Sequence, residues 1–325
     1  MSSGEDDLIA RYFKPLATAP GALGLTDDAA FVRTGGDDIV VTTDAVVEGV
    51  HFLADDPPDT IARKALRVNL SDLAAKGAMP AGFVLTLALR EVRDAWLTPF
   101  ARALGEDAAA FGCPLLGGDT VSTPGPLTIS ITAFGRVPAE KMMIRRSTAR
   151  AGDRLVVSGT IGDAALGLAL LKGSGPASLD AAARATLIAR YRVPQPRIAL
   201  ALAVRAHASA AMDVSDGLMG DLAKLCGASG VSAVIEAEAV PVSASARAWL
   251  AQDASLVGTL VSGGDDYEIL CAIPENQLAA FEAAARSAAI PIRAIGRIVD
   301  GAGPPRLVDA EQREILLKRL SYSHF

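Results

Sequence analysis

The sequence predicts an α/β (α+β) fold in two domains, and three features of the chain lead to that prediction. Short apolar segments typical of strands alternate with longer segments typical of helices. The 325 residues are enough for two cores of ordinary size. Half of the residues are hydrophobic and 21% are charged, which excludes a disordered or fibrous chain. We expect an N-terminal domain at 1–137 and a C-terminal α/β domain at 138–325.

The N-terminal half alternates strand-like and helix-like segments. The expected order is strand 38–43, helix 60–76, strand 83–89, helix 97–111 and strand 127–132. Asp59 provides an N-cap for the first helix and Gly77 ends it, because a glycine readily adopts the conformation that follows a last turn. Gly112 and Pro114 end the second helix. The order predicts a first α/β domain that finishes near Val137.

The C-terminal half begins after a connector at 145–153 and is also expected to be α/β. Its strands are expected at 155–157, 212–214, 233–237, 269–273 and 292–298, and its helices from 163 onward and at 181–191, 196–206 and 217–227. The turn from Gly159 to Asp163 matches a dinucleotide-binding loop only weakly, so we interpret it as a packing turn.

Composition and missing motifs exclude several classes of protein. Cys113, Cys226 and Cys271 are too few and too scattered for a disulfide framework or a zinc site. No run of about 18 apolar residues is present, and the acidic start lacks the order of a secretion signal, so we expect a cytoplasmic protein without a membrane partner. The net charge of −6 argues against nucleic-acid binding. The P-loop and protein-kinase signatures are missing.

Aspartates among small, turn-forming residues are the most informative feature of the chain. Five segments have this character: Thr26–Ala30, Thr42–Asp44, Ser71–Asp72, Gly117–Thr120 and Asp213–Gly217. A carboxylate in such surroundings can approach a cation closely, while nearby backbone amides remain available for phosphate oxygens. One such segment is an ordinary turn, but five across an otherwise apolar chain predict a hard-metal site. The expected ligand is a nucleotide or another polyphosphate bound through Mg²⁺.

Asp72 is the most informative single acid. On a helix it lies on the same stripe as Ile61, Ala65 and Val68. A carboxylate on an apolar stripe is unfavourable unless it is paired or bound to a metal. A buried salt bridge to a lysine or arginine such as Arg67 is the alternative, and we favour metal ligation because the other acidic segments supply partners.

The other candidate residues each have an ordinary structural explanation. Asp44 ends a predicted strand, where α/β proteins place functional groups but also plain turns. Gly117–Thr120 is typical of a phosphate-approaching turn, or of a simple bend. In Asp213–Gly217 the two acids are spaced to share metals, and Ser215 or Asp216 is alternatively an N-cap.

Cationic candidates are few. Arg145 and Arg146 are the paired cations of the connector and suit bidentate phosphate contact, although surface arginines are mostly solvated. His51 lies in a loop, where a single histidine is more often structural than functional. Ser262–Glu268 forms a second Gly-Gly-acid turn.

Taken in order, these motifs resemble the thiamine-monophosphate kinase family, in the superfamily of aminoimidazole ribonucleotide synthetase and selenophosphate synthetase. The matching segments run from end to end: Asp27–Ala30, Thr43–Asp44, Gly49–Phe52, Asn69–Ala75, Gly117–Thr120, Arg146–Ser147, Gly152–Asp153, Asp213–Leu218, Ser262–Glu268 and Tyr322–Phe325. Two positions depart from the family pattern: Thr26 stands where glycine is usual, and Asp265 where glutamate is usual.

The resemblance implies roles for a subset of residues in or beside these segments. Several Mg²⁺ ions would be held by Asp27, Thr42, Thr43, Asp44, Asp72, Asp119, Asp213 and Asp216. ATP would contact Gly118, Arg146 and Ser215, and thiamine monophosphate would contact His51, Asp265 and Tyr322. The implied fold resembles that of aminoimidazole ribonucleotide synthetase, in which two N-terminal domains pair into a β-barrel. A homodimer is therefore implied.

The implied reaction is ATP-dependent phosphorylation of thiamine monophosphate to thiamine diphosphate by direct in-line transfer. No side chain is expected as an essential general base, since the acceptor phosphate is already ionised near neutral pH. Two alternatives stay open. One is a superfamily enzyme with a different acceptor; the other is a non-catalytic nucleotide sensor on the same fold. Selenophosphate synthesis is disfavoured because the N-terminal segment carries no cysteine.

Overall fold

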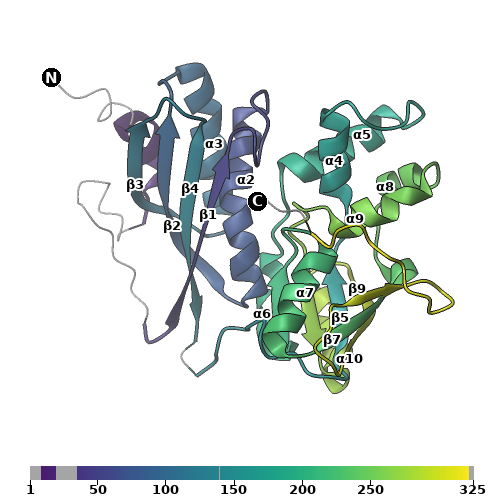
Figure 1. The fold of residues 1–325 in the computed structure, drawn as a ribbon. Coiled ribbons are helices and arrows are strands. Elements are labelled where there is room, and N and C mark those ends of the chain that lie inside the picture. Colours follow the sequence, from purple (N-terminus) through teal and green to yellow (C-terminus); the bar gives the residue numbers. More distant parts are fainter. Residues whose placement is uncertain (1–8, 20–34, 139, 322–325) are drawn as a thin grey trace. The chain divides into compact units, whose positions relative to one another are not determined.

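The computed structural model describes residues 9–19, 35–138 and 140–321. The chain divides into two compact units (Figure 1). The first comprises Met1–Leu73 and Ala78–Met142, and the second comprises Ala74–Gly77 and Met143–Phe325. The mixed α/β class predicted from the sequence is confirmed in both units.

The first unit is a four-stranded sheet with two long helices. Its elements are η1 Ile9–Phe13, η2 Lys14–Leu16, β1 Asp38–Val47, α2 Pro58–Ala75, β2 Met79–Leu89, α3 Asp94–Ala110, β3 Leu115–Ser122 and β4 Thr128–Val137. The strand order is β1-β4-β2-β3, in which β2 and β3 run parallel and the other pairs antiparallel. The sequence expectation missed β3, because its glycines and aspartate have low strand propensity.

One face of this sheet is buried and the other is exposed. Alternate residues of β2 (Phe83, Leu85, Leu87 and Leu89) are buried, as expected for a strand covered on one side by helices. On the opposite face, Val41 of β1 and Val121 of β3 are 56% and 43% exposed. The unit therefore has an open sheet face that carries apolar side chains.

The second unit contains a six-stranded sheet in the order β10-β7-β9-β5-β8-β6. The strands are β5 Arg154–Ser158, β6 Ala210–Asp213, β7 Ser232–Glu236, β8 Ile269–Ile273, β9 Ile292–Val299 and β10 Arg306–Val308. The helices are α4 Asp163–Leu171, α5 Ala181–Arg192, α6 Ala201–His207, α7 Leu218–Ser229, α8 Ala244–Leu250, α9 Val257–Ser262 and α10 Glu275–Ser287. Short 3₁₀ turns are η4 Ile198–Leu200, η5 Ala237–Ala239 and η6 Ala254–Leu256.

Both faces of this second sheet are covered. Leu155 and Val157 of β5 pack with α7 in one core, whereas Val156 packs with α6 and α10 in the other. A continuous apolar run such as β8 is typical of a strand buried on both faces. The predicted strand at 269–273 is confirmed to the residue, while α8, α9, α10 and β10 were not predicted. The helix expected at 196–206 begins later, because Pro196 and the 3₁₀ turn η4 precede α6.

Among the residues the structure describes, no helix is long and apolar enough to cross a membrane.

Candidate functional site

Asp72 accepts a hydrogen bond from a threonine, and its salt bridge to Arg67 is not found among the contacts of the described residues. The Thr42 hydroxyl on β1 donates a hydrogen bond to Asp72 Oδ2 on α2, with 2.5 Å between the two oxygen atoms. Arg67 is engaged elsewhere: its Nε and Nη2 donate to the two oxygens of buried Asp107 at 2.5 and 2.9 Å. Asp72 and Thr42 therefore have side-chain oxygen atoms next to each other, and oxygen is the ligand atom that Mg²⁺ prefers.

The polar residues of β1 are divided between the two faces of the sheet. The register pairs Asp44 with buried Ile131, which places Asp44 on the same face as Thr42 and the buried Val40. Thr43 points to the open face, where its Oγ1 accepts from Thr132 Oγ1 at 3.0 Å. Consecutive residues of a strand alternate in this way, so β1 alone cannot direct all three side chains at one point.

The segment Gly117–Thr120 is not a turn, which corrects the expectation from the sequence. It lies inside β3, and Gly118 is opposite Leu85 of β2. A Cβ on Gly118 would lie 1.9 Å from the carbonyl oxygen of Leu85, so the glycine is required by the close approach of two backbones. Gly118 therefore marks a close strand pairing and not a bend.

Asp119 lies on the open face of the sheet. The register pairs it with exposed Thr86, and the residues on either side of Thr86 are buried. Asp119 is therefore on the side of Thr43, opposite to Asp44 and the Thr42–Asp72 pair. The structure thus brings Thr42 and Asp72 together but leaves Asp119 on the other face of the same sheet.

His51 is held by contacts with the end of β1 and with α2. Its Nδ1 accepts from the backbone N–H of Val47 at 3.1 Å, and its carbonyl oxygen accepts from Nζ of buried Lys64 at 2.7 Å. A ring whose Nδ1 accepts carries its proton on Nε2. The loop therefore holds the ring in one orientation.

In the second unit, the predicted acids lie at the carboxyl end of β6. Asp213 is the last residue of β6 and is buried, and Ser215 and Asp216 follow it in the loop before α7. The predicted N-cap role is not observed for either residue, because Gly217 occupies the cap position. Instead Asp221, inside α7, accepts from the backbone N–H groups of Ser215 and Asp216, both at 2.9 Å.

Asp221 and Lys224 are two charged residues beside this loop that we did not predict from the sequence. Lys224 Nζ donates to Asp216 Oδ2 at 2.5 Å and to Asp221 Oδ1 at 2.8 Å. Burial raises the pKa of Asp221. Lys224 is partly exposed. Its ion pair with Asp216 places a cation of the protein next to this carboxylate. The i,i+3 spacing of Asp221 and Lys224 on a helix was the sequence signal that could have identified this ion pair.

The loop at 213–217 and the Gly-Gly-acid loop at 262–268 are joined backbone to backbone. The N–H of Asp265 donates to the carbonyl of Ser215, and that of Tyr267 to the carbonyl of Val214, both at 2.8 Å. A Cβ on Gly264 would lie 2.4 Å from the Ser215 carbonyl oxygen. The glycine therefore permits the contact between the two loops.

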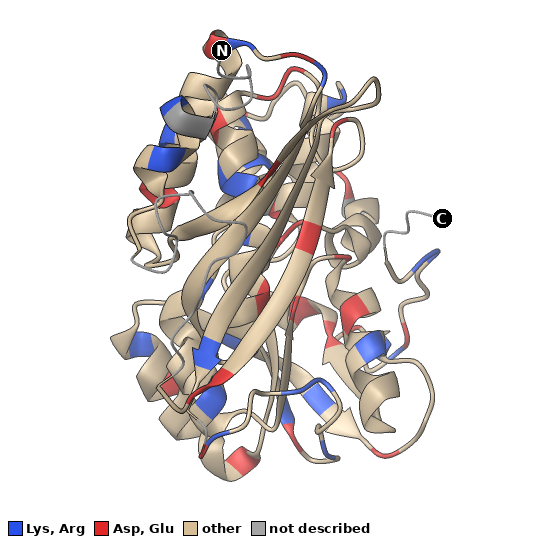
Figure 2. Cartoon of the chain, turned by 90° about the vertical axis from the view of Figure 1, so that its left-hand side faces the viewer, with Lys and Arg blue, Asp and Glu red and all other residues tan. Residues whose placement is uncertain are grey.

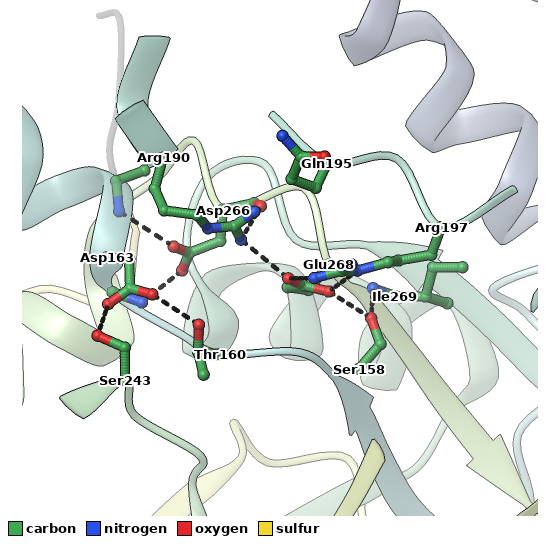
Figure 3. Close-up of polar contacts among 12 residues, drawn as sticks. Ser158, Thr160, Asp163, Arg190, Gln195, Arg197, Ser243, Asp266, Glu268 and Ile269 are labelled. Carbon is green, nitrogen blue, oxygen red and sulfur yellow. Dashed lines mark hydrogen bonds and ion pairs between the residues drawn. The ribbon is translucent and has the colours of Figure 1, made fainter. Parts of the chain in front are cut away.

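A buried polar cluster lies directly behind the second loop (Figure 3). Glu268 is fully buried and accepts from Arg190 Nη2 at 2.8 Å, from Arg197 Nε at 2.6 Å and Nη2 at 2.5 Å, and from Ser158 Oγ at 2.6 Å. Nearby, Asp266 accepts from the backbone N–H of Gly162 at 2.7 Å, and burial raises its pKa well above the usual value. Sequence separations of 71 to 110 residues hid these partners from local pattern analysis.

For three of the predicted residues the structure gives no side-chain contact at the site. Asp27 and Tyr322 lie outside the described residues. Arg146 is exposed, and its carbonyl oxygen accepts from Ser229 Oγ at 2.8 Å. Within the part of the chain that the structure describes, no three acidic, histidine or cysteine side chains are grouped closely enough to hold a metal ion. The Thr42–Asp72 pair, with hydroxyl and carboxylate oxygens, nevertheless has the donor chemistry of a Mg²⁺ ligand set.

Family models match both halves of the chain. Residues 26–137 match the N-terminal domain, and residues 150–306 the C-terminal domain, of AIR synthase related protein. Together the two matches cover most of the sequence.

Individual relatives cover nearly the whole chain. A thiamine-monophosphate kinase of Caulobacter vibrioides is 46% identical over 98% of this chain and 90% of its own length. The crystal structure of thiamine-monophosphate kinase from Stenotrophomonas maltophilia K279a has a TM-score of 0.82 at 38% identity, covering 93% of this chain and 94% of that one. A structure of AaThiL complexed with AMPPCP and TMP has a TM-score of 0.78 at 28% identity, covering 99% and 96%.

Proposed function

The chain belongs to the thiamine-monophosphate kinase family of AIR synthase related proteins, and from this membership we propose its reaction. It is an ATP-dependent kinase that phosphorylates thiamine monophosphate to thiamine diphosphate. The observation that carries this proposal is the near full-length similarity to proteins of that activity, together with AaThiL, which is complexed with AMPPCP and TMP.

We assign Mg²⁺ binding to oxygen ligands of both units. In the first unit these are Thr42, Thr43, Asp44, Asp72 and Asp119, with Asp27 from outside the described residues; in the second they are Asp213 and Asp216. The Thr42–Asp72 contact at 2.5 Å supports the assignment, because it places a hydroxyl and a carboxylate side by side. When bound, Mg²⁺ neutralises the charge of the transferring phosphates.

The proposed contacts to ATP and to the acceptor come from residues of each unit. Ser215 would contact ATP, because its loop precedes α7 and its backbone is held by Asp221. Gly118 and Arg146 complete the proposed ATP contacts. His51, Asp265 and Tyr322 are proposed to contact thiamine monophosphate. No general base is proposed, since the acceptor phosphate is ionised and its oxygen attacks directly.

We also propose that the protein is a cytoplasmic homodimer whose first units pair into a β-barrel. The open face of the β1-β4-β2-β3 sheet supports this, with Val41 56% and Val121 43% exposed. Figure 2 shows the long strands of this sheet as mainly uncharged. A sheet face with exposed apolar side chains is unusual on a monomer and typical of an interface. Sedimentation of the full chain at twice its mass is the expected result.

A chromatographic assay with ATP, Mg²⁺ and thiamine monophosphate tests the proposed reaction. Matched formation of thiamine diphosphate and ADP, abolished by chelation of Mg²⁺, is expected. ATP consumption without thiamine diphosphate would instead indicate a superfamily enzyme with another acceptor. Stable ATP binding without turnover would indicate a nucleotide sensor.

A further inference from the structure

The loop at 262–268 has an unfavourable backbone conformation at two residues that are not glycine. Asp265 has φ 71° and Tyr267 has φ 52°, both in the left-handed region. Side chains with a Cβ disfavour this region, and such residues persist only where their surroundings hold them. Asp265 is one of the residues proposed to contact the acceptor, so what holds this loop bears on acceptor binding.

The residues between and after these two positions anchor the loop from inside. Asp266 directs its carboxylate to the start of α4, where it accepts from the N–H of Gly162 at 2.7 Å. Glu268 is fully buried and is held by Arg190, Arg197 and Ser158 (Figure 3). Each carboxylate therefore fixes the backbone adjacent to a left-handed residue.

Arg190 and Arg197 act on the loop in different ways. Arg197 binds both carboxylate oxygens of Glu268 through Nε and Nη2, a bidentate contact that fixes the orientation of the carboxylate. Arg190 Nη2 donates to Glu268 Oε1 at 2.8 Å and also to the backbone carbonyl of Asp266 at 3.2 Å. The Arg190 guanidinium thus connects the Glu268 carboxylate to the loop backbone between Asp265 and Tyr267.

The close packing behind the loop leaves the Glu268 side chain little freedom to move. A Cβ on Gly159 would lie 2.1 Å from Glu268 Oε1 and 2.5 Å from Arg197 Nη2. Ser158 Oγ, which donates to Glu268, also accepts from the N–H of Ile269 at 2.8 Å. The Glu268 carboxylate is therefore fixed by Arg190, Arg197 and Ser158, with Gly159 packed against it.

We propose that Glu268, held by Arg190 and Arg197, is a positioning residue for the acceptor: it fixes the backbone at 265–267 and thereby aims the Asp265 carboxylate at thiamine monophosphate. This inference rests on the proposed function. Glu268 touches no substrate, because it is fully buried behind the loop. It acts through Asp265, and through the hydrogen bond from the Asp265 N–H it also supports the loop of Ser215.

A double-mutant cycle tests this action of one residue through another. The variants are Glu268→Gln, Asp265→Ala and the double variant of the full chain, with KM for thiamine monophosphate, KM for ATP and kcat measured for each. Glu268→Gln keeps the shape of the side chain and removes its charge. We expect KM for thiamine monophosphate to rise about tenfold in the wild-type background and by less than about twofold in the Asp265→Ala background, since residues that act as a unit are not additive.

Asp153→Asn is the matched control. Asp153 is also a buried carboxylate of the second unit, and it accepts from the Arg150 N–H at 2.9 Å and from Ser209 Oγ at 2.5 Å. It makes no hydrogen bond to the 262–268 loop among the contacts of the described residues. Its substitution should lower stability and leave KM for thiamine monophosphate unchanged.

Equal effects of Glu268→Gln in both backgrounds would overturn the positioning role, because a merely structural residue gives additive losses. If Glu268→Gln does not fold, Arg190→Gln takes its place in the same cycle, since Arg190 contacts both Glu268 and the loop backbone. A wild-type protein that does not phosphorylate thiamine monophosphate would overturn the proposed function itself. Turnover by the wild type with an additive cycle would overturn only the role of Glu268.

Discussion

Replacing Gly118 by alanine is expected to separate two strands of the first unit. The added Cβ would lie 1.9 Å from the carbonyl oxygen of Leu85, whereas Cβ atoms essentially never approach another heavy atom within 3.0 Å. The backbones of β2 and β3 would have to move apart by about 1.1 Å, the difference between these two distances. Because the obstacle is backbone, no side-chain rotation can relieve the clash.

The loss of stability follows from the backbone hydrogen bonds between β2 and β3. A shift of that size takes a backbone hydrogen bond from about 2.9 Å to about 4 Å, beyond the range in which it contributes. Losing two such bonds, each worth about 1 kcal/mol net, and adding the strain of an overpacked site gives about 2–4 kcal/mol of destabilisation. That is a large share of the roughly 5–15 kcal/mol of a typical domain.

Urea unfolding measures this effect, and Gly117 provides the control. The chain has two tryptophans, Trp96 and Trp249, so in a Trp249→Phe background Trp96 fluorescence reports on the first unit alone. A Cβ on Gly117 would meet no atom within 4 Å. Gly117→Ala should therefore leave the midpoint unchanged or raise it slightly. Equal midpoints for the two alanine variants would refute the argument from close approach.

Three further predictions follow from particular contacts. Asp72→Asn should lower turnover about 100-fold or more and raise the Mg²⁺ concentration needed, and a near wild-type rate at low Mg²⁺ would contradict the ligand assignment. Asp107→Asn should destabilise the first unit by about 3 kcal/mol, because buried Asp107 serves both Arg63 and Arg67, and a urea midpoint would show it. Burial raises the pKa of Cys113 and Cys271 to about 12, so neither thiol should be alkylated at pH 8 before denaturant is added. Since the unfolded thiols ionise near pH 8.5, their contribution to stability is complete below that pH and is lost as the pH rises towards 12, which unfolding midpoints across this range would reveal.

Much of the fold could be predicted from local patterns. Helix α2 was expected at 60–76 and spans Pro58–Ala75, and β8 was predicted to the residue. These elements are long or continuously apolar, so periodicity alone identifies them. Strand β3 was not predicted, because glycine has a low strand propensity and Gly118 is required by the close approach of β2. Only the neighbouring strand explains the glycine at position 118.

The sequence by itself determined the family, the mixed α/β class and the side-chain chemistry of the candidate residues, because residue type and spacing are properties of the chain. The tertiary structure decided which of those residues meet. It paired Thr42 with Asp72, sent Arg67 to Asp107 and placed Asp119 on the opposite sheet face from Asp44. It also gave Glu268 its two arginines from more than 70 residues away. Such contacts depend on strand register and on long-range packing, which no local pattern encodes.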